Sequence, residues 1–185
     1  MAAETVIKQI NLNQGQRAER KLLVTVAEWT EKTLDGTTEG TETVRELLGT
    51  RTEDSSIDYN PDIQESTDIL GNNYTDVNKT QPSQAFDPFL ILGGSRLGAF
   101  LNDIRRRNAL SELQQFTIYV ITAFVGNEID GYETERHTDC SITYDSIGGD
   151  ANVNFPITVH FSNKITTGTV DKIGPDLAFT PDVTI

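Results

Sequence analysis

The chain has 185 residues, of which 36% are hydrophobic. That share is enough for one domain with a core, and it excludes a collagen or a fully disordered chain. The sequence shows no run of about 18 apolar residues and no apolar segment behind a basic start, so we expect neither a membrane span nor a signal peptide. With 28 acidic and 15 basic residues the formal charge is −13, and so acidic a surface repels phosphates, which excludes ordinary nucleic-acid-binding modules.

The acidic excess is concentrated in one segment. From Glu28 to Asp76 there are 13 acidic and 3 basic residues, a net charge of −10, which leaves −3 for the rest of the chain. Most of the charge imbalance therefore lies in this one segment.

The N-terminal quarter of the chain contains one clear strand. Residues 1–20 are polar and predict an arm, which needs a surface to dock on because terminal residues otherwise fray. We expect a neighbouring chain to provide that surface. Residues 22–29 are apolar and β-branched and predict a strand, whereas residues 31–43, with two Gly and many Thr, predict a loop or a long hairpin tip. Residues 44–50 fit either a strand or a short helix.

Residues 50–80 predict a long β-arm. The segment is polar and acidic, but isolated apolar residues punctuate it, and turn signals occur at residues 60–62 and 70–73. We read two thin strands around residues 55–80. A two-stranded arm is marginally stable alone, so we expect it to lie against something. The residues that we predict to make this contact are Ile57, Tyr59, Ile63, Ile69 and Tyr74.

One helix is predicted within residues 95–110. From Leu97 onward, apolar residues recur at i, i+3, i+4 and i+7, which marks one helical face. Ser95 is placed as the N-cap, and the cations of residues 105–107 suit the C-terminal end of the helix dipole. We place the helix from about Arg96 to Ala109.

The C-terminal half predicts four more strands and a tail. Residues 116–125 are nearly all apolar and predict a strand buried on both faces. Residues 132–144 alternate, as do residues 155–161, and residues 165–173 predict an edge strand ahead of a tail at 175–185. Strands that follow one another without intervening helices favour antiparallel pairing. The fold class is therefore mainly β: one domain over residues 1–185, an antiparallel sandwich or open barrel with one flanking α-helix.

Known catalytic and metal-binding patterns fail on inspection. Residues 93–97 (GGSRL) lack the final Gly of a nucleophile elbow and predict a turn before the helix. Residues 58–62 begin like a calcium loop, but the required Gly and Glu do not follow. The single cysteine, Cys140, excludes an intrachain disulfide, and with only two His it is too little for a structural zinc site. We expect no enzyme activity, no metal and no cofactor.

Residues 132–144 fit two alternatives, a site that uses His137 or a solvated strand face. The odd positions Glu133, Glu135, His137 and Asp139 predict one polar, acidic strand face. A carboxylate–imidazole site on His137 is conceivable there, and a solvated face is favoured over it. Similarly, residues 105–107 are more consistent with a helix end facing acidic neighbours than with a phosphate site.

The chain is predicted to have much β structure, few residues in catalytic patterns, an unsupported arm and an acidic strand face. These features suit a self-assembling structural subunit. Five stretches extend this interpretation to a family: residues 11–23 (NLNQGQRAERKLL), 53–61 (EDSSIDYNP), 67–71 (TDILG), 78–84 (NKTQPSQ) and 160–163 (HFSN). Together they resemble the tail tube (major tail) proteins of siphophages, over nearly the whole chain.

The resemblance implies a specific assembly. Subunits would form homohexameric rings, closing an inner β-barrel around a channel, and residues 50–80 match the family's long stacking loop. Tape-measure, baseplate or distal-tail and tail-terminator proteins are the implied partners, in a virion tail assembled in the host cytoplasm, with no membrane. Genomic DNA would pass through the lumen without specific binding, since six copies carry 6 × (−13) = −78 charges. We predict that Glu133, Glu135 and Asp139 face this lumen.

Three alternatives stand beside a siphophage tube. The first is the tube protein of a phage-tail-like particle, contractile or bacteriocin-type. The second is a carbohydrate-binding β-sandwich, which predicts an exposed aromatic platform, although Trp29 is the only Trp and ends an apolar strand. The third is a small hydrolase built on His137, which predicts a cleft and a nucleophile.

Overall fold

The computed structural model describes residues 10–35, 38–52 and 55–182. These residues form eleven β-strands, one α-helix and two short 3-10 helices. The strands are β1 (Leu23–Asp35), β2 (Thr38–Leu47), β3 (Ile57–Asp58), β4 (Asp62–Thr67), β5 (Asn73–Lys79), β6 (Ser83–Phe86), β7 (Phe116–Asn127), β8 (Gly131–Tyr144), β9 (Ile157–His160), β10 (Ile165–Val170) and β11 (Phe179–Pro181). The helical elements are η1 (Arg20–Leu22), α1 (Arg96–Arg107) and η2 (Leu110–Gln114).

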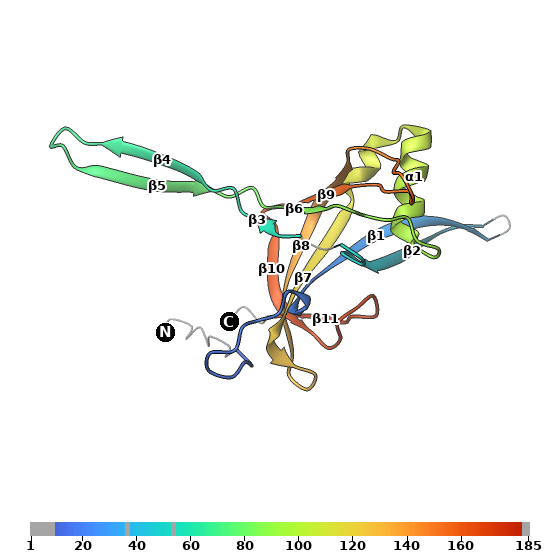
Figure 1. Ribbon diagram of the computed structural model, residues 1–185, viewed down its shortest axis with the longest axis horizontal. Coiled ribbons are helices and arrows are strands. Elements are labelled where there is room, and N and C mark those ends of the chain that lie inside the picture. The colour runs from blue at the N-terminus through green and yellow to red at the C-terminus, as the bar shows by residue number, and fades with distance from the viewer. Residues whose placement is uncertain (1–9, 36–37, 53–54, 183–185) are drawn as a thin grey trace.

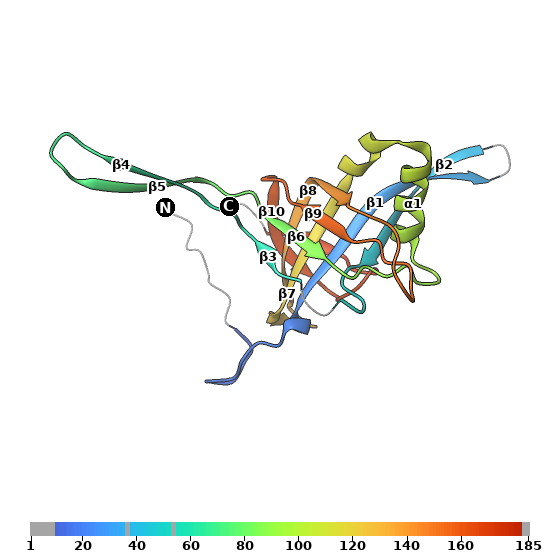
Figure 2. The ribbon, with the colours of Figure 1, turned by 45° about the horizontal axis from the view of Figure 1, so that its top comes forward.

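Nine of the strands form one antiparallel sheet. Its order is β2-β1-β7-β8-β9-β6-β3, with β10 also paired to β8 and β11 paired to β10. The long strand β8 joins the two halves of the sheet, because its first part pairs with β7 and β10 and its last part pairs with β9. The predicted class, mainly antiparallel β with one helix, is confirmed, and the sheets are not closed into a barrel. Figures 1 and 2 show α1 near the β1–β2 end and the β4–β5 hairpin projecting from the other side.

Strand β7 is buried on both faces, as its apolar run predicts. Ile118 and Val120 belong to the main hydrophobic cluster, which also includes residues of α1 and β9. Tyr119 and Ile121, which alternate with them, belong to a second cluster on the opposite face. One strand thus supplies both cores.

The second core is covered by the C-terminal segment. Leu177 is buried against Val26 and Val170, and Phe179 packs beside it on Tyr119. Strand β11 pairs with β10. Residues 175–182 of the predicted tail therefore pack on the body, and β10 has a partner on both sides where β11 covers it, contrary to the predicted edge strand. Residues 183–185 lie outside the described residues.

Helix α1 follows its sequence pattern closely. Its N-cap is Ser95, whose hydroxyl accepts a hydrogen bond from the Gly98 N–H at 3.0 Å. Leu97, Leu101 and Ile104 are buried along one face. Asn108 ends the helix in the left-handed conformation, with φ of 54°. The predicted helix and its cap are confirmed.

Residues 31–43 form the outer part of a hairpin, the second of the two predicted alternatives. Strands β1 and β2 pair from Val26 opposite Leu47 out to Asp35 opposite Thr38, which makes a long hairpin. The many Thr residues suit this ladder, since β-branched side chains favour extended backbone, and they outweigh the two Gly that suggested a loop. Only residues 36 and 37, between the strands, lie outside the described part. The alternative for residues 44–50 is settled as strand up to Leu47.

The main core supplies a first test. Phe116 is buried, and its ring centroid lies 6.1 Å from that of Trp29. Phe116→Ala is expected to lower the free energy of unfolding by about 3–5 kcal/mol, because it removes buried surface and leaves a cavity. Urea unfolding followed by the fluorescence of Trp29, the only Trp, measures this change. The control Ile129→Ala, on a side chain 93% exposed, should stay within about 0.5 kcal/mol of the parent.

Candidate functional site

The most prominent surface of the molecule is the arm, which we define as the β4–β5 hairpin and its turn (residues 62–79). The two strands pair only with each other, apart from the main sheet. Ile63 and Val77 lie directly opposite one another, and both are exposed. The arm therefore carries apolar side chains that its own body does not cover, as the sequence predicted.

The predicted arm residues divide into two groups. Tyr59, Ile63, Ile69 and Tyr74 are exposed. Ile57 is placed differently, because β3 pairs with β6 and the Ile57 side chain packs against the main cluster. Because β3 belongs to the sheet of the body, Ile57 lies at the root of the arm and not along it.

The root of the arm is fixed by backbone hydrogen bonds. The Gln81 N–H donates to the Tyr59 carbonyl at 3.1 Å, and Asn60 Nδ2 donates to the Gln81 carbonyl at 3.3 Å. Asn60 has a φ of 42°, a left-handed conformation that Asn tolerates better than most residues. The chain thus leaves and re-enters the body at adjacent points.

The N-terminal segment docks on its own chain where it is described. The Asn11 N–H donates to the Phe124 carbonyl at 2.9 Å, and Ile10 bridges to Val125. Arg20 Nε donates to the Ser55 carbonyl at 2.9 Å. For residues 10–20 the expected docking surface is therefore the same subunit. Residues 1–9 of the predicted 1–20 arm lie outside the described residues.

The acidic positions of β8 do not form the single strand face that the sequence predicted. Glu135 lies opposite Val120 and His137 opposite Ile118, so these side chains share the face of the main core. The next core-facing residue is Cys140, opposite Phe116. The alternation therefore slips by one residue between His137 and Cys140, and Asp139 lies in this irregularity with a φ of 57°. Simple alternation could not reveal a bulge.

His137 is also placed differently from a solvated strand face, because only 3% of it is exposed. Its Nε2 lies 3.3 Å from Glu135 Oε2, and its Nδ1 lies 3.3 Å from the Ser162 carbonyl. Asp139, the third member of the conceivable carboxylate–imidazole site, pairs with Lys164 instead. Glu135 also lines a cavity of about 240 Å³ at the root of the arm, together with Tyr59.

The His137–Glu135 contact predicts a dependence of stability on pH. The hydrogen bond from His137 holds the pKa of Glu135 below its usual 4.5. A depressed pKa in the folded state stabilises the fold above pH 4.5, and this contribution is lost as the pH falls through the folded value. Glu135→Gln should therefore flatten the acid decline of the urea midpoint between about pH 6 and pH 3. The exposed control Glu128→Gln should keep the decline of the parent, and equal profiles for all three proteins would contradict this assignment.

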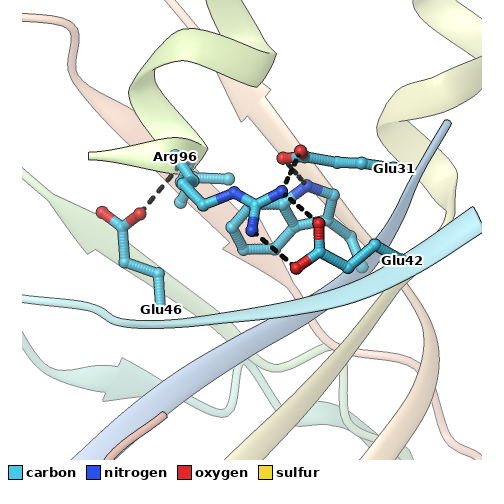
Figure 3. A network of polar contacts seen from close by, with 6 residues as sticks. Glu31, Glu42, Glu46 and Arg96 are labelled. Carbon is cyan, nitrogen blue, oxygen red and sulfur yellow. Dashed lines mark hydrogen bonds and ion pairs between the residues drawn. The ribbon is translucent and has the colours of Figure 1, made fainter. Parts of the chain in front are cut away.

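A second polar cluster clamps the β1–β2 hairpin to α1 (Figure 3). Arg96 donates to both oxygens of Glu42 at 3.0 Å and to Glu31 at 2.6 Å. These two carboxylates raise the pKa of Arg96. Glu46 accepts from the Leu97 N–H at 2.9 Å and from the Ser95 hydroxyl at 2.7 Å, so it caps the helix from another element. The pairs join residues 49 to 65 positions apart, which no local pattern in the sequence could indicate.

The hydrogen bonds of Ser95 predict the effect of removing the N-cap of α1. Ser95→Ala is expected to lower the free energy of unfolding by about 0.5–2 kcal/mol, because it removes the hydroxyl that satisfies the Gly98 N–H. Ser95→Asp, which keeps an acceptor but places a charge near Glu46, should fall between parent and Ser95→Ala. Urea unfolding of the three proteins at equal ionic strength measures the order. A fully stable Ser95→Ala would show that Glu46 alone suffices.

One of the three arginines at the end of α1 pairs with carboxylates. Arg107 lies 2.6 Å from Asp103 and 2.8 Å from Glu112, as predicted for a helix end facing acidic neighbours, whereas Arg105 donates to Asn102. Burial raises the pKa of the Cys140 thiol. Within the described ranges, no three His, Cys, Asp or Glu side chains gather as a possible metal site, and no helix is long and apolar enough to span a membrane.

Three strands of the main sheet have an open edge in the described part of the chain. Strand β2 pairs only with β1, the two-residue strand β3 pairs only with β6, and β11 pairs only with β10. An open edge presents backbone N–H and C=O groups that another strand can pair with. The edge of β2 is the longest of the three.

Comparisons with known proteins assign the chain to no family. No family model matches the chain, and no curated protein sequence matches it. One similar solved chain comes from a structure described as the cryo-EM structure of the anti-feeding prophage (AFP) baseplate, 6-fold symmetrised. That chain is 9% identical, with a TM-score of 0.43, and the match covers 88% of this chain and 100% of that one. A likeness of this extent says nothing about what this protein binds.

Proposed function

We propose that the chain is a non-enzymatic structural subunit of a phage tail or a phage-tail-like particle, and specifically the tube protein. In this proposal, homohexameric rings stack into a hollow tube through which DNA passes. The family and the six-fold symmetry come from the sequence resemblance. The observations below support the assembling character of the subunit.

The observation that carries the proposal is the uncovered arm. Every residue of β4 is exposed, although the strand includes Ile63, and the turn that follows exposes Ile69 and Leu70. A two-stranded hairpin without a third element is marginal in water. Contact with another copy would bury these side chains and stabilise the hairpin.

The open edge of β2 supports the same conclusion. Lateral pairing of this edge with a strand of the next copy would satisfy its free backbone groups, and repetition around an axis would leave no edge unpaired. The clamp of Arg96, Glu31 and Glu42 holds the hairpin on α1 before assembly. Such preorganisation reduces the entropy lost on association.

The lining of the channel stays a prediction. In the single subunit Asp139 is exposed. Glu133 and Glu135 lie opposite Thr122 and Val120 of β7, and their side chains share one face of the sheet. An acidic lumen would repel DNA and avoid the release of counterions that makes binding tight. The predicted tape-measure, baseplate and terminator partners, and the location in a particle, likewise belong to this proposal.

A carbohydrate-binding module requires an exposed aromatic platform, and the single Trp of the chain does not provide one. Trp29 is buried, and its Nε1 donates to Glu31 at 2.9 Å. The indole thus packs in the core, against Phe100 and Phe116, and forms no platform for a sugar. We therefore retain the structural function.

Deletion of the arm tests the proposal. Because Asn60 and Gln81 lie within hydrogen-bonding distance, residues 61–80 can be replaced by two Gly without disturbing the body. Negative-stain electron microscopy should show rings or tubes for the parent protein and none for the deletion. The deletion should retain the urea midpoint of the parent, since the arm adds little buried surface.

A matched control shortens a different exposed turn, by replacing residues 128–130 with two Gly. It should assemble as the parent does. Normal tubes from the arm deletion would refute the role of the arm. A parent protein that stays monomeric under all conditions, including high concentration and elevated salt, would refute the tube function itself.

A further inference from the structure

The turn of the arm is held in one conformation by Asp68. Its Oδ1 accepts from the Leu70 N–H and from the Asn72 N–H, both at 2.8 Å. The Gly71 N–H donates to the Asp68 carbonyl at 3.0 Å, and Gly71 has a φ of 84°. This is a tight turn followed by a left-handed Gly, a common way to close a hairpin. The carboxylate satisfies backbone donors that water would otherwise bind.

The second oxygen of Asp68 extends the same network. Oδ2 accepts from Asn72 Nδ2 at 2.9 Å and from the Tyr74 hydroxyl at 3.0 Å. These hydrogen bonds lower the pKa of Asp68. The Asp68 carboxylate therefore accepts four hydrogen bonds, two from backbone N–H groups and two from side chains, which is far more order than a solvated loop tip requires.

This ordered turn presents two apolar side chains to solvent. Ile69 is 102% exposed and Leu70 is 81% exposed, at the two central positions of the turn. Turn positions usually carry polar residues or Gly. An apolar pair on a rigid support loses little conformational entropy when it docks, so it suits an anchor in an interface. We call residues 68–72 the tip.

The tip stands far from its own body in both Figure 1 and Figure 2. The arm extends away from the sheet, and its root is fixed by the hydrogen bonds of Asn60 and Gln81. A surface that buries Ile69 and Leu70 must therefore belong to another molecule.

The body carries a cavity that matches the tip. It has a volume of about 340 Å³ and opens between the start of β1, the end of β2 and the residues Thr50, Thr52 and Ser55. Leu23, Leu47, Leu48 and Phe86 supply apolar lining. Cavities of roughly 300–1,000 Å³ are large enough for small ligands, and so for two aliphatic side chains.

The charges at the cavity and on the arm are complementary. The cavity is also lined by Arg20 and Lys21, and Lys21 pairs with Glu19 at 2.5 Å, so among the described residues the unpaired cation of the lining is Arg20. Arg20 donates to the carbonyl oxygens of Ser55 and Leu23, which leave its formal charge in place. The arm carries four carboxylates and one Lys, a net of −3 (Asp62, Glu65, Asp68, Asp76 and Lys79). Opposite charges around an apolar contact favour encounter and orientation.

Three other cavities are larger and fit less well. The cleft of about 830 Å³ between β1 and α1 is lined by Arg96 and Arg107, whose charges are already paired with carboxylates. The cavity of about 590 Å³ is lined by Glu128 and Asp171, whose charges would repel an acidic arm. The cavity of about 370 Å³ beside Phe89 contains Arg45 and Arg96, which are paired with carboxylates. None of the three combines an apolar lining with an arginine that bonds only to carbonyl oxygens, as Arg20 does.

We propose that the tip of one copy inserts Ile69 and Leu70 into the cavity lined by Leu23, Leu47 and Phe86 of a second copy. Asp68 is the positioning residue, and Arg20 orients the approach. This inference rests on the self-assembly in the proposed function and names the surface that receives the arm. Because donor and acceptor are different surfaces, the contact is heterologous and joins copies head to tail.

Variants at the tip test the donor side. Leu70→Asp and Ile69→Asp alter side chains that touch nothing in the subunit, so the urea midpoint should stay unchanged. We expect each to abolish the tubes seen for the parent in negative-stain images. Ile129→Asp, at a site 93% exposed in another turn, is the matched control and should assemble. Asp68→Ala should weaken assembly while Ile69 and Leu70 are intact.

Variants at the cavity test the acceptor side. Leu47→Asp places a charge at a position 38% exposed on the cavity wall, and Thr50→Trp fills the cavity from an exposed position should the first variant fold poorly. Each alone should fail to form tubes. Mixing an acceptor variant with Leu70→Asp should restore a limited, paired complex in size-exclusion chromatography, because one partner keeps its tip and the other keeps its cavity.

Cross-linking identifies the contact directly. The only native cysteine, Cys140, is buried, so added thiols react with little background. The double variant Leu70→Cys/Leu47→Cys should form a ladder of covalent oligomers under mild oxidation. The control pair Ile129→Cys/Leu47→Cys should not form a ladder.

The outcomes separate the two proposals. Parent tubes that persist in Leu70→Asp, together with no ladder from the double cysteine variant, would overturn the tip contact and leave the tube function standing. A parent that forms no assembly, with no ladder, would overturn both. A ladder together with loss of tubes in Leu70→Asp supports the contact.

Discussion

The structure depends on the burial of β7 between two hydrophobic clusters. A one-residue slip in register would turn every side chain of a strand to its other face, so packing against a core specifies the register, and β7 packs against a core on each face. Ile118 faces the cluster under α1, and Tyr119 faces the cluster under the C-terminal segment. β1 and β8 are aligned against this strand, and the hairpin, the clamp and the root of the arm follow from their positions.

The body and the arm follow different physical rules. The body buries its apolar residues within one subunit, and its helix is capped from a neighbouring strand by Glu46. The arm buries almost nothing, and it is ordered instead by cross-strand pairing and by Asp68. Changes to the arm are therefore expected to affect association with little effect on the stability of the subunit, which is how an assembling protein can separate the two properties.

Local sequence patterns predicted most of the fold. Ser95 and the spacing from Leu97 located α1, and the apolar run located β7 with its two buried faces, because both signals are contained within a few residues. The bulge near Asp139 was missed, since alternation is blind to an extra residue in a strand. His137 was assigned to a solvated face because its neighbours on that face are acidic, but the face lies against the main core and His137 is buried. For residues 31–43 the local pattern left a loop and a hairpin tip open, and the pairing of β1 with β2 decides for the hairpin.

The candidate site was predictable only in outline. The turn signal and the sparse apolar residues indicated an unsupported arm, but no local pattern indicated that Ile57 belongs to the body. The clamp around Arg96 and the cavity near Arg20 join segments far apart along the chain. Contacts of that kind arise only after the sheet has formed, so they require the structure.

The one-sided placement of the arm has a consequence for growth. The subunit extends its arm from one side only, and the β1–β2 hairpin leaves from the other (Figure 1). Copies joined through such unlike sides would give a polymer with polarity: one terminus would display unfilled receptors and the other unused projections. Each terminus would then require a different capping factor, and elongation could start from a template that offers only one of the two kinds of surface.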